Sequence, residues 1–180
     1  MTVLLLIREL AIGGAERQLV SLACELKTAN VDVKVAVFYK GGALEAELQK
    51  YDIPIIALDK SGRFDILPFA WNFIRMVSQI RPTIIYSFLT GPNLCALLAR
   101  LRFPRQIILW GVRASARDAI LRQNDWFVRL VFWMSRYLSR FSNLIIVNSF
   151  ASKTLLEQFG VPSSKVVVIS NGIDIIDINR

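Results

Sequence analysis

The chain has 180 residues, of which 54% are hydrophobic and 20% charged, so it is long and apolar enough to bury a core and is not an intrinsically disordered chain. Histidine is absent and the two cysteines, Cys24 and Cys95, fall in apolar helical stretches, which argues against a zinc site and against a mechanism with a histidine base. The net charge of +8 is concentrated between Arg100 and Arg140, where nine arginines stand against two acidic residues, and this indicates a local anionic partner.

Seven short apolar segments predict β-strands along the whole chain. They are Thr2–Ile7, Asp32–Phe38, Pro54–Leu58, Thr83–Phe88, Gln106–Gly111, Leu144–Val147 and Val166–Ile169. Segments such as LIIV and VVVI are apolar on both faces, which is typical of buried parallel strands.

Helical patterns lie between these strands. The clearest run from Ala15 to Leu26, from Asp65 to Ile80 with Pro68 in the first turn, and from Asn93 to Leu101. Turn signals are expected between elements at Gly41-Gly42, Gly62, Gly91-Pro92, Gly160 and Asn171-Gly172. Strict β/α alternation predicts an α/β fold, a doubly wound Rossmann-like parallel sheet of about seven strands.

The first strand breaks into Gly13-Gly14, and a helix follows directly. A strand, a glycine pair and a helix N-terminus present backbone N–H groups and a partial positive charge, which suit a phosphate or another anion. The alternative is that the two glycines only allow a sharp turn. Glu16 is interpreted as a charge that complements the helix dipole.

The segment from Asp118 to Phe141 predicts one long helix of about 36 Å. Its expected core stripe consists of Phe127, Leu130, Val131, Met134, Leu138 and Phe141. The opposite face carries Arg122, Arg129, Arg136 and Arg140, flanked by Trp126 and Trp133, which favours contact with an anionic membrane surface. A solvated basic face is the alternative, and no motif for nucleic acid is present.

Four stretches together resemble a known family. They are IGGAERQLVSLACEL, the segment from Gly41 to Leu48, the strand RPTIIYSFL, and VNSFASKTLLEQFGVPSSKVVVISNGID. In this order they look like the N-terminal domain of a bacterial retaining glycosyltransferase of GT-B architecture. The resemblance implies an N-terminal, acceptor-side domain over residues 1–172 and the start of an interdomain linker over 173–180. A C-terminal donor-binding domain is then missing from the chain, and this part alone is expected to transfer no sugar.

The resemblance also assigns candidate substrate-binding residues. Gly13 and Gly14 match a glycine loop that approaches the donor pyrophosphate, and Arg17 follows one turn later. Arg113 stands where many relatives carry a histidine, and Ser115 lies in the same loop. Thr90 and Asn93 qualify by their position after a strand, and the closing motif contributes Asn171 and Gly172.

An arginine stays charged near neutral pH, so Arg113 is expected to bind an anion or to form a structural ion pair, and no catalytic residue is assigned. The expected partners are a nucleotide-sugar donor as co-substrate, a glycan or lipid-linked acceptor, and the C-terminal domain, without metal, other cofactor or nucleic acid. The hypothesis is sugar transfer in cell-surface polysaccharide synthesis. Because the opening apolar run is too short for a secretory signal and no transmembrane stretch occurs, we expect a cytoplasmic protein, peripheral on the inner membrane face.

Two other functions remain open at this point. One is a sugar-nucleotide epimerase of similar build, although the acidic and histidine residues expected of it are missing. The other is a non-enzymatic module that binds an anion or lipid.

Overall fold

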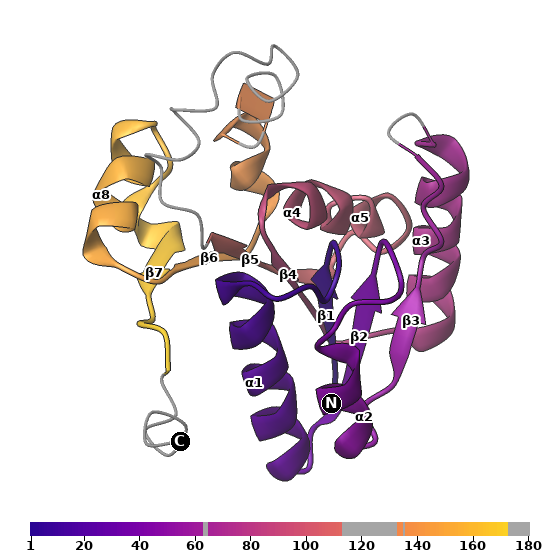
Figure 1. Cartoon of the computed structure of the whole chain (residues 1–180). Helices are drawn as coiled ribbons and strands as arrows, with labels where there is room; N and C mark the ends of the chain where they lie inside the picture. The colour runs from indigo at the N-terminus through magenta and orange to yellow at the C-terminus, as the bar shows by residue number, and fades with distance from the viewer. Residues whose placement is uncertain (63–64, 113–132, 135, 173–180) are drawn as a thin grey trace.

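The computed structural model of the chain describes residues 1–62, 65–112, 133–134 and 136–172 (Figure 1). Its strands form one parallel sheet in the order β3-β2-β1-β4-β5-β6-β7. Their bounds are β1 Thr2–Ile7, β2 Asp32–Val37, β3 Ile55–Ala57, β4 Ile84–Phe88, β5 Ile107–Val112, β6 Leu144–Val147 and β7 Val166–Val168. Each predicted strand is confirmed to within one residue at either end, and so is the doubly wound fold.

The helices in the described part of the chain follow the strands in turn. They are α1 Gly14–Thr28, α2 Glu45–Lys50, α3 Leu67–Ile80, α4 Thr90–Ala96, α5 Ala99–Arg102 and α8 Phe150–Gln158, with short 3₁₀ turns η1 Ser139–Phe141 and η2 Ser163–Lys165. The pattern from Asn93 to Leu101 is two helices, not one. The expected turn at Gly91-Pro92 is wrong, because both residues lie in the first turn of α4, where a proline sacrifices no helical hydrogen bond.

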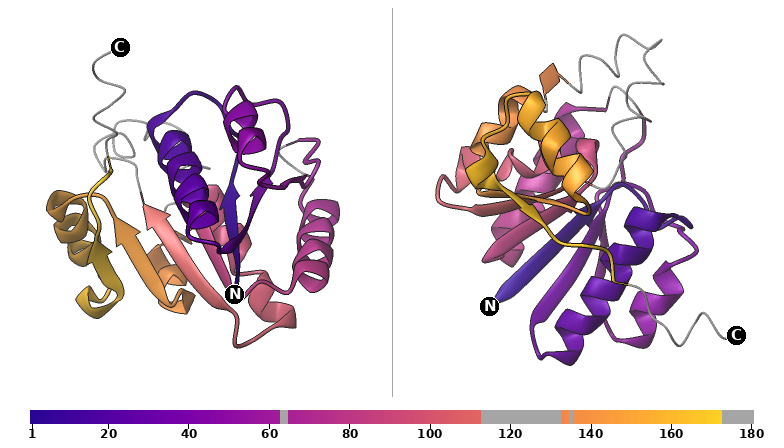
Figure 2. Two further views of the ribbon diagram at one scale, coloured as in Figure 1. Left: turned by 90° about the horizontal axis from the view of Figure 1, so that it is seen from below. Right: turned by 90° about the vertical axis from the view of Figure 1, so that its left-hand side faces the viewer.

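The helices cover the sheet in two unequal layers (Figure 2). The steps from β1 to β2 to β3 place α1 and α2 on one face, and the later crossovers place α3, α4, α5 and α8 on the other. Side chains of β1 alternate accordingly: Leu4 and Leu6 face the larger layer, while Leu5 and Ile7 face α1 and α2. The reversal of direction between β1 and β4 marks a topological switch point.

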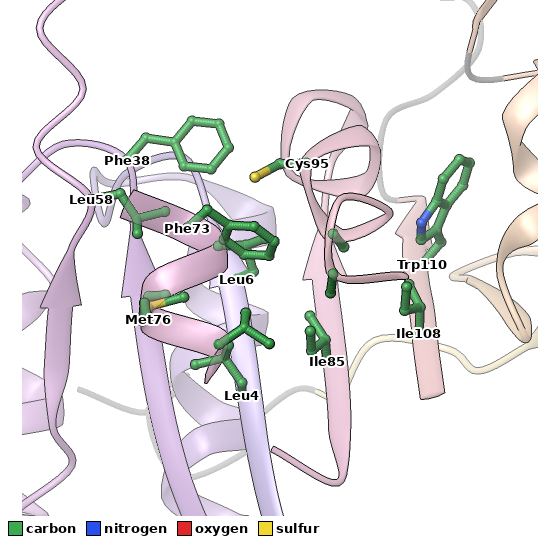
Figure 3. Packing of buried hydrophobic residues seen from close by; sticks show 14 of the residues in the cluster. Leu4, Leu6, Phe38, Leu58, Phe73, Met76, Ile85, Cys95, Ile108 and Trp110 are labelled. Atoms are coloured by element: carbon green, nitrogen blue, oxygen red, sulfur yellow. The ribbon is translucent and has the colours of Figure 1, made fainter. Parts of the chain in front are cut away.

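The larger layer encloses the main hydrophobic core (Figure 3). Phe73 of α3 is fully buried against the sheet, close to Leu4 and Leu6 of β1. Phe38, just after β2, meets Phe69 edge to face with ring centroids 4.6 Å apart. Trp110 of β5 closes the core on the side toward α8.

Both cysteines are free and buried, one in each core layer, as the sequence indicated. Burial raises the pKa of the Cys95 thiol, and burial together with Glu47 and Glu25 raises the pKa of Cys24. We expect neither thiol to react with a thiol-specific disulfide reagent in the folded chain at neutral pH, because the thiolate is the reactive form. Both should react after unfolding in denaturant. A colorimetric thiol count before and after denaturation checks this, and a thiol that reacts in the native chain would contradict it.

Candidate functional site

All strands of the sheet end at the same side, here called the carboxyl edge. The loops after β1 and β4 leave this edge toward opposite faces, one to α1 and the other to α4 (Figure 1). In open parallel sheets, such a divergence opens a crevice in which ligands bind. In this chain, the Gly13-Gly14 turn and the Thr90-Asn93 segment lie on the two sides of one such switch point.

The turn at the start of α1 is accessible. Gly13 caps the helix in an extended conformation, and no side chain donates or accepts a capping hydrogen bond there. Gly14 is exposed, and a Cβ atom at its position would meet no atom within 4 Å. The N-terminus of this 15-residue helix therefore lies at the carboxyl edge with Gly14 at the surface.

Two charged residues of the first turn differ in their placement. The Glu16 carboxylate folds back over the turn, since its Oε2 lies 2.2 Å from the position of a Cβ on Gly13. This agrees with the interpretation of Glu16 as a charge at the positive end of the helix dipole. Arg17 is exposed, and its backbone N–H donates to the Gly13 carbonyl at 3.0 Å.

The loop after β1 is supported from the side by the loop after β2. The Leu44 N–H donates to the Leu10 carbonyl at 3.0 Å. A Cβ on Gly42 would lie 2.3 Å from the Leu10 carbonyl carbon and oxygen, so only glycine fits this close approach of two backbones. The Glu45 carboxylate accepts from the N–H groups of Gly41 and Gly42 at 2.8 and 3.3 Å. Gly41-Gly42 lies between β2 and α2, as predicted, but no pattern in the sequence indicates its contact with Leu10.

On the other side of the switch point, Asn93 joins three elements. Its side chain is buried, accepts from the Ser87 hydroxyl at 2.7 Å, and donates to the Gly111 carbonyl at 3.3 Å. The residue before α4, Leu89, has a φ of 71°, a strained value for a leucine. Thr90, in contrast, is exposed at the carboxyl edge. A substrate contact of Thr90 or Asn93 stays a prediction.

The end of the described chain returns to α1. The Gln18 side chain, one turn beyond Gly14, donates from Nε2 to the Gly172 carbonyl at 2.8 Å. Asn171 and Gly172 are both exposed. The structure thus brings the closing SNG segment next to the helix whose first turn carries the glycine pair, although the two are about 150 residues apart in the sequence.

Part of the predicted basic segment lies outside the described residues, namely Arg113, Ser115, Arg122, Trp126 and Arg129. Trp133, Arg136 and Arg140 are described and exposed, as expected. Trp133 stacks on Tyr137 with centroids 6.0 Å apart, and the Arg140 guanidinium lies 3.6 Å from the centroid of the same tyrosine ring. Trp133, Tyr137 and Arg140 thus form one exposed cluster, whereas the Arg136 guanidinium lies beside Gly160.

Of the predicted core stripe, Phe127, Leu130 and Val131 lie outside the described residues, and the prediction is wrong for Met134 and Phe141. Leu138 packs against the core, but Phe141 is 48% exposed and Met134 is 37% exposed. Ser139–Phe141 form a 3₁₀ turn with three residues per turn, so Phe141 rotates away from the face that an α-helical period assigns to it.

Within the described residues, no group of three or more His, Cys, Asp or Glu side chains is placed to hold a metal ion. The same residues contain no helix long and apolar enough to cross a membrane. The loops at the carboxyl edge carry both signs of charge, with Arg8 and Arg17 as well as Glu9 and Glu16 after β1.

Comparison with known proteins now adds to this geometry. The family model described as Glycosyltransferase Family 4 matches residues 12–176, which is most of the chain. The chain belongs to glycosyltransferase family 4. A search of curated proteins found no match.

Solved structures show how widely the fold of this family 4 chain is shared. HepE from Anabaena in complex with UDP-glucose superposes with a TM-score of 0.76 at 22% identity, over 98% of this chain and 45% of HepE. The lipopolysaccharide outer core galactosyltransferase WaaB also gives 0.76, at 14% identity over 97% of this chain and 47% of WaaB. A UDP-GlcNAc 2-epimerase from Neisseria meningitidis gives 0.62, at 18% identity over 95% of this chain and 46% of that enzyme. The chain spans less than half the length of each, and its fold is that of one domain of a GT-B glycosyltransferase.

Proposed function

We propose that the chain is the acceptor-side domain of a glycosyltransferase that moves a sugar from a nucleotide-sugar to a glycan or lipid-linked acceptor in cell-surface polysaccharide synthesis. The observation that carries the proposal is the Gly13-Gly14 turn at the start of α1, which lies at the switch point of the sheet with Gly14 exposed. Backbone N–H groups there suit the pyrophosphate of a donor. Family membership and the likeness to HepE, which binds UDP-glucose, support a sugar transferase with such a donor.

The proposed enzyme has a second lobe that follows residues 1–172 through a linker beginning at 173–180, and the two lobes close on the donor. The chain alone then transfers no sugar. In the retaining mechanism proposed here, the leaving phosphate helps to deprotonate the acceptor hydroxyl, so the chain needs no strong base. The groups of this chain bind and orient the donor. Gly13 and Gly14 do so through backbone N–H groups, and Arg17 and Arg113 do so through charge.

Nuclear magnetic resonance of the ¹⁵N-labelled chain tests donor binding at the glycine pair. We expect UDP-glucose to shift the backbone amide signals of Gly13, Gly14 and Ala15, because they would donate to the pyrophosphate. Glucose, which lacks phosphate, serves as the matched control ligand and should leave these signals unchanged. Shifts that are absent with UDP-glucose and with other UDP-sugars would contradict the proposal.

The exposed cluster of Trp133, Tyr137 and Arg140, with the exposed Arg136 one turn before Arg140, supports a second part of the proposal, peripheral contact with the inner face of the cytoplasmic membrane. Arginines attract anionic headgroups, and each basic residue near such a surface contributes about 1 kcal/mol. Tryptophan and tyrosine prefer the interfacial region. Such contact would hold the domain at the surface in which a lipid-linked acceptor lies.

Co-sedimentation with anionic vesicles tests the membrane contact. We expect Arg136→Glu with Arg140→Glu to lower the bound fraction strongly, since the double substitution changes the local charge by four units. The matched control is Arg102→Glu with Arg105→Glu, which makes the same charge change at exposed positions at the end of α5 and before β5, outside this cluster. Equal losses in the two variants would mean that only total charge matters, and no loss in the first would exclude this contact.

The structural likeness to UDP-GlcNAc 2-epimerases keeps one alternative activity in view. An epimerase would convert UDP-N-acetylglucosamine into its C2 epimer without any acceptor, whereas a transferase would release UDP only when an acceptor is present.

The gene sequence beyond Arg180 separates both enzymatic functions from a stand-alone binding module. A second βα domain with two glutamates eight residues apart supports the transferase, and an immediate stop codon supports an anion- or lipid-binding module.

A further inference from the structure

The connection between β4 and α4 is very short. β4 ends at Phe88 and α4 begins at Thr90, so Leu89 alone forms the turn at the carboxyl edge (Figure 1). Connections from a strand to a helix in α/β folds commonly contain about two to six residues. The backbone angles of a single residue must therefore turn the chain from the strand into the helix.

Leu89 makes this turn in a conformation that is found almost only in glycine. Its φ is 71° and its ψ is 166°, a region that residues with a Cβ atom avoid. The other non-glycine residues with positive φ in the described chain are Asn30, Asp52, Asp59 and Arg81, with φ between 47° and 59°. Asn and Asp tolerate the left-handed region, and Arg81 has the ordinary left-handed ψ of 55°. A leucine at the angles of Leu89 stores backbone strain instead.

Hydrogen bonds on both sides hold the strained turn in place. The Leu89 N–H donates to the Gly111 carbonyl at 3.0 Å, and the Leu89 carbonyl accepts from the Asn93 N–H at 3.0 Å. The Asn93 side chain donates to the same Gly111 carbonyl at 3.3 Å and accepts from the Ser87 hydroxyl at 2.7 Å. Strained backbone persists only where surrounding contacts fix it, and such places are concentrated at functional sites.

Packing does not explain why a leucine occupies this position. The Leu89 side chain is half-buried, and among the described residues it packs against neither of the two hydrophobic cores. A glycine would adopt the same angles without strain, so stability alone favours glycine here. What a leucine adds is restriction, because a glycine also adopts many other backbone angles. The residue therefore fixes the direction in which the next side chain leaves the sheet.

That next residue, Thr90, is exposed at the carboxyl edge, across the switch point from Gly13-Gly14. A sharp, strained turn from a strand to a helix also presents the serine hydroxyl at the top of the sheet in the α/β-hydrolase fold. A serine of that kind is activated by a histidine, and this chain contains no histidine. The role open to the Thr90 hydroxyl within this chain is therefore to donate and accept hydrogen bonds.

We propose that Leu89 is a positioning residue whose strained turn holds the Thr90 hydroxyl for a hydrogen bond with a hydroxyl group of the acceptor sugar. Leu89 acts through Thr90 and does not itself bind the sugar. The inference rests on the proposed function, since it names the pair of residues that orients the acceptor opposite the donor pyrophosphate. Because the donor is proposed to bind at Gly13-Gly14, donor affinity should not depend on Leu89.

Two substitutions separate the strain of Leu89 from its side chain. Leu89→Ala removes most of the side chain but keeps the Cβ atom and the strain, whereas Leu89→Gly removes both. We expect the Leu89→Gly chain to have the higher Tm of the two. Asn72, at an exposed position within α3, is the matched control, and there Asn72→Gly should have a lower Tm than Asn72→Ala. A Leu89→Gly chain that melts below the Leu89→Ala chain overturns the proposal.

Transfer assays with the enzyme that contains this chain test the positioning role. We expect Leu89→Ala to keep most of the activity, and Leu89→Gly to lower kcat/KM for the acceptor about threefold to tenfold with the donor KM unchanged. Thr90→Val removes the hydroxyl at nearly constant shape and should lower the same kcat/KM about fivefold to tenfold. Arg81→Gly, the matched control at a positive φ beyond the end of α3, should change neither constant.

The double variant shows whether Leu89 acts through Thr90. Leu89→Gly combined with Thr90→Val should lose no more activity than Thr90→Val alone, because no hydroxyl is left to position. Losses that multiply in the double variant, or full activity in Leu89→Gly, overturn the positioning role and leave the transferase standing. An unaltered enzyme that transfers sugar from no nucleotide-sugar contradicts both proposals.

Discussion

Replacing Gly42 with alanine is expected to lower the free energy of unfolding by about 1–3 kcal/mol. The added Cβ would lie 2.3 Å from backbone atoms of Leu10, which cannot rotate aside as a side chain can. The two loops must separate, and the hydrogen bond from the Leu44 N–H to the Leu10 carbonyl is strained or lost. For a chain of this size, each kcal/mol lowers Tm by about 2–4 °C, so a thermal melt measures the effect.

Gly62→Ala is the matched control for Gly42, because a Cβ at Gly62 would meet no atom within 4 Å. Its Tm should stay close to that of the unaltered chain. The displaced Leu10 precedes Gly13-Gly14, so Gly42→Ala should also weaken any anion binding at the glycine pair. A Gly42→Ala chain as stable as the Gly62→Ala chain would show that the two loops are not packed as described.

Asn93→Ala should have an effect of similar size for a different reason. It removes the acceptor of the Ser87 hydroxyl and leaves the Gly111 carbonyl without its side-chain donor, all in a buried place. Loss of these contacts is expected to cost about 2–3 kcal/mol, measurable by urea unfolding. Asn72→Ala, on the exposed face of α3, should cost little. Equal midpoints for the two variants would contradict the buried network.

A double-mutant cycle shows whether Ser87 and Asn93 act as a unit. Ser87 also donates to the Leu109 carbonyl at 3.2 Å, so Ser87→Ala alone is expected to cost less than Asn93→Ala. If the pair is coupled, the double variant should cost clearly less than the sum of the single variants. Strict additivity would mean that the 2.7 Å contact between their side chains contributes nothing.

Much of the fold could be predicted because its strands are short, apolar on both faces and separated by helices, which leaves few other arrangements. The glycine pair at the start of α1 was predicted for the same reason, since a strand, two glycines and a helix are contiguous in the sequence. The sequence pattern gave a wrong prediction where the number of residues per helical turn changes locally. An α-helical period placed Phe141 in the core, but Phe141 lies in a 3₁₀ turn and is exposed.

Contacts between segments that are far apart in the chain could not be predicted from the sequence. Nothing in the pattern around Gly42 indicates that it lies against Leu10, and nothing around Trp110 indicates that its indole nitrogen lacks an acceptor. A small cavity beside Trp110 is lined by α4, β5, β6, α8 and residues near η1, so its shape depends on how five elements pack. Side-chain volumes at such a junction are decided by packing in three dimensions rather than by periodicity.

The position of β1 in the sheet has a consequence for synthesis on the ribosome. Val3 of β1 pairs with Val33 of β2 early, but its other neighbour, Ile84 of β4, is made about 80 residues later. At about 5–20 residues per second, the growing polypeptide holds one side of β1 unpaired for several seconds. During that interval the apolar edge of β1 can pair with other nascent chains, and a chaperone bound there would protect the incomplete chain from aggregation.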